Sequence, residues 1–187
     1  MSIFDKLLKK NTQTTVNTSS GSFADKETFV FNALPESLSE LQSLPEASLD
    51  SPFATAALTV CSLCVYAVDK QIGTEMLNYL RGPRPLSNHE ISFLNDRFSE
   101  VKYVPFSYFK DAVPSNDYTP SEPFTLTVES GVYSDANKGY KKLFIRSGGA
   151  DSPREILLRQ SSDGKWYLWD QFLLLSIRKA KSDDPWA

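Results

Sequence analysis

The sequence of 187 residues holds little of what most active sites and metal centres need. It has one histidine, His89, and two cysteines, Cys61 and Cys64. A single imidazole leaves few ways to assemble a nucleophile–base pair, and two cysteines without a histidine cluster do not complete a metal site. Walker, G-x-G-x-x-G, G-x-S-x-G and H-E-x-x-H motifs are also missing. We therefore expect no cofactor and no metal; an enzyme would have to rely on Asp, Glu, Lys or Tyr.

An excess of basic charge and long apolar runs are likewise missing. Lys and Arg number 20 against 23 Asp and Glu, a net charge of −3, which is far from the basic balance of a nucleic-acid-binding protein. No apolar stretch reaches the roughly 20 residues that span a bilayer. The first ten residues lack the continuous apolar core of a secretory signal. We expect a cytoplasmic chain whose partner is a protein and not a nucleic acid.

The N-terminal residues predict a helix and a linker ahead of the folded part. Residues 1–10 place apolar side chains on one helical stripe with lysines beside it, namely Ile3, Phe4, Leu7 and Leu8 with Lys6, Lys9 and Lys10. Such a helix docks weakly on a membrane or in a partner groove, packs on its own domain, or frays. Residues 11–22 are small and polar, which is typical of a flexible linker. Residues 23–187 are then expected to form one domain.

Helical signals dominate the first half of that domain. Helices are predicted at about 37–44, 52–68, 72–80 and 88–100, the first and last beginning at a Ser-x-x-Glu capping box. The helix at 52–68 is apolar on most of its circumference, so we expect Cys61 and Cys64 within it to be buried and unreactive. His89 lies beside the second capping box, where a surface position explains it.

The last third alternates with a period of two, which indicates strands. Strands are predicted at 124–128, 142–146, 155–159 and 165–169, with a tight turn at Asp163-Gly164 and an earlier β-prone run at 28–31. Residues 172–177 fit a fifth strand or, slightly better, a closing helix. The predicted class is α+β, with N-terminal helices packed on a C-terminal antiparallel meander of four to five strands. An NTF2-like cone with an enclosed pocket is a special case of this element order.

A glycine-containing loop and two aromatic clusters supply the candidate site. Arg146 and Arg154 end a loop whose backbone N–H groups suit a phosphate or carboxylate, although a plain hairpin loop is the favoured explanation of the same residues. In the last predicted strand, alternation places Trp166 with Leu168 on one face, and Tyr167 with Trp169 on the other, and one face is left for a partner. The residues expected to bind a ligand are Arg146, Ser147, Gly148, Gly149, Asp151, Arg154, Tyr108, Trp166 and Trp169.

Three strings carry a resemblance to a known family. Residues 104–109, 143–154 and 166–169, together with the ending at 184–187, resemble a family of uncharacterised bacterial proteins of unknown function. The resemblance covers roughly residues 28–187 and implies no particular activity.

Two functions are therefore expected as alternatives. The first is a cytoplasmic protein-interaction or scaffold module that uses residues 1–10, the Arg146–Arg154 loop and the exposed aromatic face. The second is a domain that binds a small anionic ligand in a pocket between sheet and helices, with Tyr108, Trp166 and Trp169 as its walls.

Overall fold

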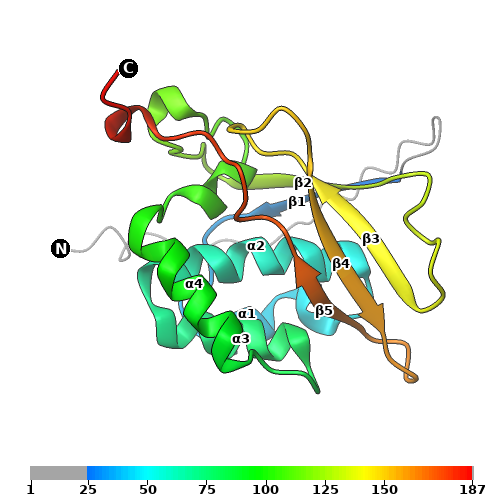
Figure 1. Ribbon diagram of the computed structural model, residues 1–187. Helices are drawn as coiled ribbons and strands as arrows, with labels where there is room; N and C mark the ends of the chain where they lie inside the picture. The colour runs from blue at the N-terminus through cyan, green and yellow to red at the C-terminus, as the bar shows by residue number, and fades with distance from the viewer. Residues whose placement is uncertain (1–24, 187) are drawn as a thin grey trace.

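A computed structural model describes residues 25–186 and shows a five-stranded sheet with helices packed on one face (Figure 1). The strands lie in sequence order, each antiparallel to its neighbours. They are β1 (Lys26–Phe31), β2 (Phe124–Ser130), β3 (Tyr140–Ile145), β4 (Arg154–Gln160) and β5 (Trp166–Gln171). The predicted α+β class is confirmed.

The β-prone run that precedes the helices forms β1 and adds a fifth strand to the four C-terminal ones. β1 pairs with β2 across a gap of more than 90 residues, with Phe29 opposite Leu126 and Phe31 opposite Phe124. In the sequence, all four α-helices of the described residues therefore lie between β1 and β2. The segment that follows β1, residues 32–37, leads directly to the first helix.

The prediction of a strand or helix at 172–177 is wrong. This segment forms turns, and Ser176 has a φ of 53°, a left-handed conformation that neither element continues. Side chains supply its hydrogen bonds: the Tyr108 hydroxyl donates to the carbonyl of Leu173, and Arg154 Nη2 donates to the carbonyl of Ser176 at 2.7 Å. Leu173 is fully buried. The apolar spacing that suggests a helix therefore reflects burial of a turn.

The four α-helices of the described residues begin within about two residues of the predicted starts. They are α1 (Leu38–Ser43), α2 (Pro52–Val68), α3 (Lys70–Arg81) and α4 (Asn88–Glu100). Helix α3 begins at Lys70, earlier than the predicted 72. The Ser51 hydroxyl accepts from the first turn of α2, and the full Ser87–Glu90 capping box is present on α4. A 3₁₀ turn, η3 (Val104–Tyr108), follows α4 and packs against α2.

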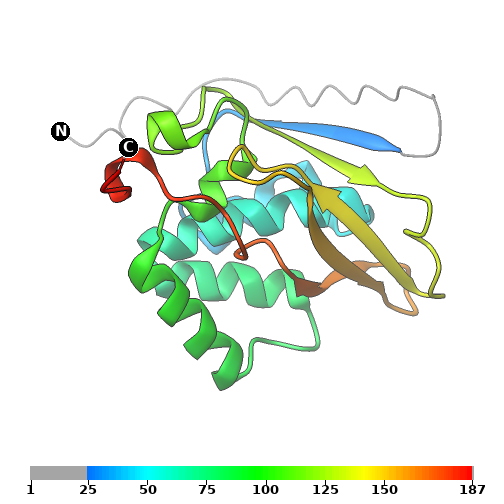
Figure 2. The same cartoon turned by 45° about the horizontal axis from the view of Figure 1, so that its top comes forward.

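Helix α2 is the centre of the core (Figure 2). It contacts all five strands and α3, and every residue in it is buried except Pro52, Val65 and Val68. Its buried hydroxyls at Thr59 and Ser62 donate to carbonyls one turn earlier at 2.8 Å. The facing sheet side chains are at most 3% exposed: Leu126, Val128, Leu143, Ile145, Ile156, Leu158 and Leu168. The space between sheet and α2 is thus filled, and only one end of the helix presents apolar side chains outward.

The predicted helix at 1–10 and the predicted linker at 11–22 lie outside the described residues. Within residues 25–186, no helix has both the length and the apolar composition needed to cross a bilayer.

Candidate functional site

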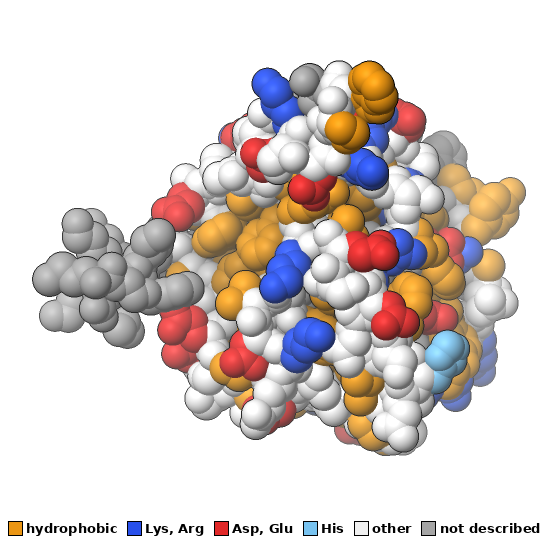
Figure 3. Space-filling model, turned by 60° about the vertical axis from the view of Figure 1, so that its left-hand side comes forward, with side chains coloured by type: hydrophobic (Ala, Val, Ile, Leu, Met, Phe, Trp, Pro, Cys, Tyr) orange, Lys and Arg blue, Asp and Glu red, His pale blue; other side chains and the backbone are white. Residues whose placement is uncertain are grey.

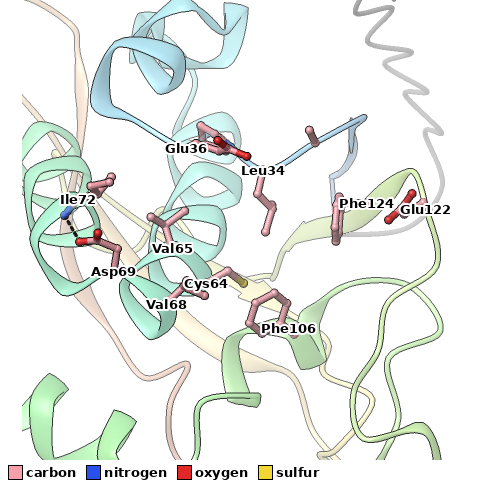
Figure 4. Close-up of a pocket in the computed structure, with 12 residues that line it drawn as sticks. Leu34, Glu36, Cys64, Val65, Val68, Asp69, Ile72, Phe106, Glu122 and Phe124 are labelled. Atoms are coloured by element: carbon pink, nitrogen blue, oxygen red, sulfur yellow. Dashed lines mark hydrogen bonds between the residues drawn. The ribbon is translucent and has the colours of Figure 1, made fainter. Parts of the chain in front are cut away.

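A pocket of about 460 Å³ lies at the C-terminal end of α2 (Figure 4). Its walls come from the segment after β1, from α2, α3 and η3, and from the start of β2. Figure 4 shows apolar side chains from these elements around one open space, chiefly Leu34, Val65, Val68, Ile72, Phe106 and Phe124. We call this pocket the α2 groove.

The junction between two helices keeps the groove open. Val65 and Val68 are three residues apart and share a face of α2. The helix ends immediately afterwards because Asp69 caps α3, accepting hydrogen bonds from the backbone N–H groups of Gln71 and Ile72 at 2.9 and 3.0 Å. The chain turns away at this cap, and Val68 stays 79% exposed. An apolar side chain of that exposure at the mouth of an apolar pocket is available to a partner.

The charged residues that line the groove are all acidic. They are Glu36, Asp69 and Glu122, and each of the three is exposed. The Asp69 carboxylate is partly offset by the N-terminus of α3, whereas Glu36 and Glu122 lie on loops. The face on which α2 ends shows hydrophobic side chains in a hollow with both acidic and basic side chains around it (Figure 3). The three carboxylates that line the groove itself attract a cation and repel an anion.

Cys64 borders the groove but does not offer a nucleophile. Its side chain is 1% exposed, and burial raises the pKa of its thiol well above the usual value, with a further rise from neighbouring Cys61. Burial also raises the pKa of Cys61, helped by the charge of Glu46. The expectation that both cysteines are buried is confirmed. His89 is exposed on the first turn of α4, and no group of three His, Cys, Asp or Glu in residues 25–186 is arranged to hold a metal.

The burial of both thiols predicts slow labelling. In the native chain at pH 8, a thiol reagent such as Ellman's reagent should react at least about 100-fold more slowly than in the urea-unfolded chain, because neither sulfur is exposed nor ionised. The absorbance of the released thiolate follows both rates. A fast native reaction would show that α2 opens readily at the groove.

The predicted anion loop has its polar groups occupied by the protein itself. The N–H of Gly148 donates to the carbonyl of Ser107 at 2.8 Å, and the N–H of Gly149 donates to the Ser147 hydroxyl at 3.0 Å. Arg154 donates to carbonyls at both Ser152 and residues 175–176. Asp151 pairs with Arg178, and Arg146 with Glu129. Anion binding here requires these contacts to be exchanged, and it stays a prediction.

The predicted aromatic lining residues lie in different places. Tyr108 is 3% exposed inside the core, where burial raises the pKa of its hydroxyl well above the usual range. The backbone N–H of Trp166, at the start of β5, donates to the carbonyl of Leu49 at 2.7 Å. Trp169 lies on the outer face of the sheet with guanidinium groups of Arg84 and Arg159 at 4.5 and 4.9 Å from its ring. None of the residues predicted to bind a ligand lines the α2 groove.

Sequence reasoning missed the groove because its walls are distant along the chain. Val65 and Val68 lie in a helix that is apolar on most of its circumference, and no local signal says which face stays uncovered. Leu34 and Phe124 meet them only because β1 pairs with β2. The one available signal was Asp69, a capping residue placed directly after an apolar helix.

The structure thus defines an α+β domain with an apolar, acid-rimmed groove at the end of its central helix. The sequence profile described as Domain of unknown function (DUF6935) matches residues 33–181, most of the chain, and the protein belongs to that family. The match begins just after β1, although β1 completes the sheet. No curated protein and no solved structure matches the chain. The expected resemblance to a family of unknown function is confirmed, and its bacterial source stays a prediction.

Proposed function

We propose that the chain is a binding module that docks a short basic amphipathic segment of a partner protein in the α2 groove. One observation carries the proposal: the walls of the groove are apolar, and the charged residues that line it are three carboxylates. An amphipathic helix that projects apolar side chains at i, i+3 or i+4, with Lys or Arg beside them, satisfies both features. The apolar side chains enter the groove while the cations face the rim.

Burial and charge play separate parts in this recognition. Val68, at 79% exposure, and the half-buried Val65, Phe106 and Phe124 lose contact with water when the groove is filled, which stabilises the complex. The carboxylates of Glu36 and Glu122 set the orientation of the segment and speed its encounter with the domain. The cytoplasmic location and protein partner expected from the sequence form part of this proposal.

The alternative of a small anionic ligand fits this groove less well. The volume of about 460 Å³ lies in the range of small-molecule sites. The acidic rim, however, opposes an anion, and Arg146 and Arg154 do not line the groove. The favoured occupant is therefore positively charged.

A designed peptide pair tests the proposal with the full chain. A fluorescent 14-residue helix of Leu and Lys is compared with a Leu and Glu counterpart of the same pattern by fluorescence anisotropy. We expect micromolar binding of the Leu–Lys peptide and at least about tenfold weaker binding of the Leu–Glu peptide. The double variant Val68→Asp/Glu122→Lys should weaken binding of the Leu–Lys peptide at least about tenfold, because it places charge in the groove and reverses a rim charge.

A matched variant distinguishes an effect of the groove on peptide binding from an effect of surface charge elsewhere on the domain. Val132 is 69% exposed on the β2–β3 connection and Glu75 is exposed on α3, and neither lines the groove. Val132→Asp/Glu75→Lys makes the same chemical changes and should leave binding unaltered. Equal binding by both double variants, or equal binding of both peptides, would overturn the proposal.

A further inference from the structure

We infer that residues 1–10 of this chain occupy its own α2 groove, so that a partner segment must displace them. The inference rests on the proposed function and names a regulator of the same site. Under this inference, residues 1–10 compete with the partner segment for the groove within the same chain.

The sequence of the segment has the chemistry that the groove selects. Its apolar stripe of Ile3, Phe4, Leu7 and Leu8 matches the apolar walls. Three lysines against one aspartate give residues 1–10 a side-chain charge of +2, whereas the lining residues carry three carboxylates. Opposite charge around an apolar contact favours this pairing over the other surfaces of a chain whose net charge is −3.

The length of the intervening chain fits the distance to be covered. The described chain begins at Asp25 and enters β1, the blue strand in Figure 2. Three residues after the end of β1, Leu34 lies in the wall of the groove. A strand of six residues spans about 20 Å. Residues 11–24 are mostly small and polar, and 14 residues of this kind have a root-mean-square span of about 20 Å and a maximum of about 48 Å. The tether therefore reaches back along β1 without being stretched.

A tether whose average span matches the separation gives a high local concentration. For short flexible linkers this is on the order of 1 mM. For a segment with an intrinsic dissociation constant of about 100 μM, the ratio of filled to open grooves would then be about ten. A partner would bind about tenfold more weakly than it would to an open groove. Binding by the domain would thus respond to anything that draws residues 1–10 away.

The full chain with a disrupted stripe tests the competition. Phe4→Asp/Leu7→Asp should bind the Leu–Lys peptide about tenfold more tightly than the unmodified chain. Val16→Asp, a change in the tether, should leave the affinity unaltered. Equal affinity for the unmodified and stripe-disrupted chains would overturn the inference and leave the groove function standing. Failure of the peptide to bind either chain would overturn the proposed function and, with it, this inference.

A spin label locates the segment directly. Cys61 and Cys64 are buried, so a nitroxide reagent applied to a Ser2→Cys variant labels position 2. The methyl signals of Val65 and Val68 should broaden, while those of Val132 should not. A second sample mixes isotope-labelled chains that carry no spin label with spin-labelled chains that carry no isotope. If the broadening comes from chains in this mixture and not from within one chain, a second copy is the occupant and the intramolecular form is overturned. No broadening, together with co-sedimentation on phosphatidylglycerol vesicles, would assign residues 1–10 to a membrane surface and likewise overturn it.

Discussion

Replacing Glu90 by alanine is expected to lower the free energy of unfolding by about 3–5 kcal/mol, because it strands a buried cation. The side chain of Arg81 is only 4% exposed, and its Nη2 lies 2.7 Å from Glu90 Oε1. The same carboxylate accepts hydrogen bonds from the backbone N–H and hydroxyl of Ser87, which caps α4. The Glu90→Ala change therefore removes both the partner of a desolvated guanidinium and one half of a capping box.

The two partners are not equivalent, and the difference is measurable. The side chain of Glu90 is already 31% exposed to water, and in Arg81→Met it would still be held by Ser87 and by Arg84, whose Nη2 lies 3.6 Å from Glu90 Oε1. Its cost should be about 1–2 kcal/mol, since methionine keeps much of the apolar stem. Urea unfolding of both single variants and of the double variant gives the coupling energy. The double variant should be more stable than Glu90→Ala alone; strict additivity would contradict the assignment of an ion pair between the buried Arg81 and Glu90.

Acid titration provides an independent control on the same pair. Burial acts to raise the pKa of Glu90, but the hydrogen bonds from Ser87 and the charges of Arg81 and Arg84 outweigh it and lower the pKa below the ordinary value of 4.5. A lowered folded-state pKa means that the unfolded chain takes up the proton first. The stabilisation is then complete above about pH 4.5 and is lost as the pH falls through the folded value. The unmodified chain should therefore lose more stability than Glu90→Ala on acidification across this range.

Local signals were sufficient to predict most of the helices and strands. The Ser87–Glu90 capping box is a pattern of four residues, and it forms in the structure as the sequence indicates. Gly164 adopts a φ of 87° in the β4–β5 turn, as its place after Asp163 predicts. In these cases neighbours in sequence are also partners in space.

Features that depend on distant partners were not predictable. The turn at 172–177 is held by Tyr108 and Arg154, and nothing in its own sequence reveals them. The α2 groove likewise depends on the β1–β2 pairing, which brings Leu34 beside the end of α2. The sequence shows that Val65 and Val68 are apolar, but it does not show that the chain turns away at Asp69 and leaves them uncovered.

The Gly148–Gly149 loop shows how one residue type supports two interpretations. Glycine is required where a backbone approaches an anion and equally where it approaches another backbone. In the structure, a Cβ added at Gly148 would lie 2.0 Å from the carbonyl oxygen of Ala112. The N–H of Gly148 donates to Ser107, so the loop cannot retreat without losing that hydrogen bond. The structure therefore explains this glycine by close packing.

Gly148→Ala is accordingly expected to cost about 3 kcal/mol, because a backbone oxygen cannot move aside as a side chain can. For a domain of this size the melting temperature should fall by about 6–12 °C. Gly131→Ala is the matched control: its Cβ would lie 3.1 Å from Phe144 Cε2, an atom of a ring that can shift, and the cost should stay below about 1 kcal/mol.

Melting with and without 10 mM phosphate distinguishes the two explanations of the loop. If Gly148 serves packing, the Gly148→Ala variant melts lower in both conditions, and the shift caused by phosphate is the same as in the unmodified chain. If it serves an anion, the variant keeps its melting temperature without phosphate and loses a stabilisation that the unmodified chain shows, since a ligand stabilises only the state that binds it. The contact with the Ala112 carbonyl favours the first result, because the overlap exists whether or not an anion is present.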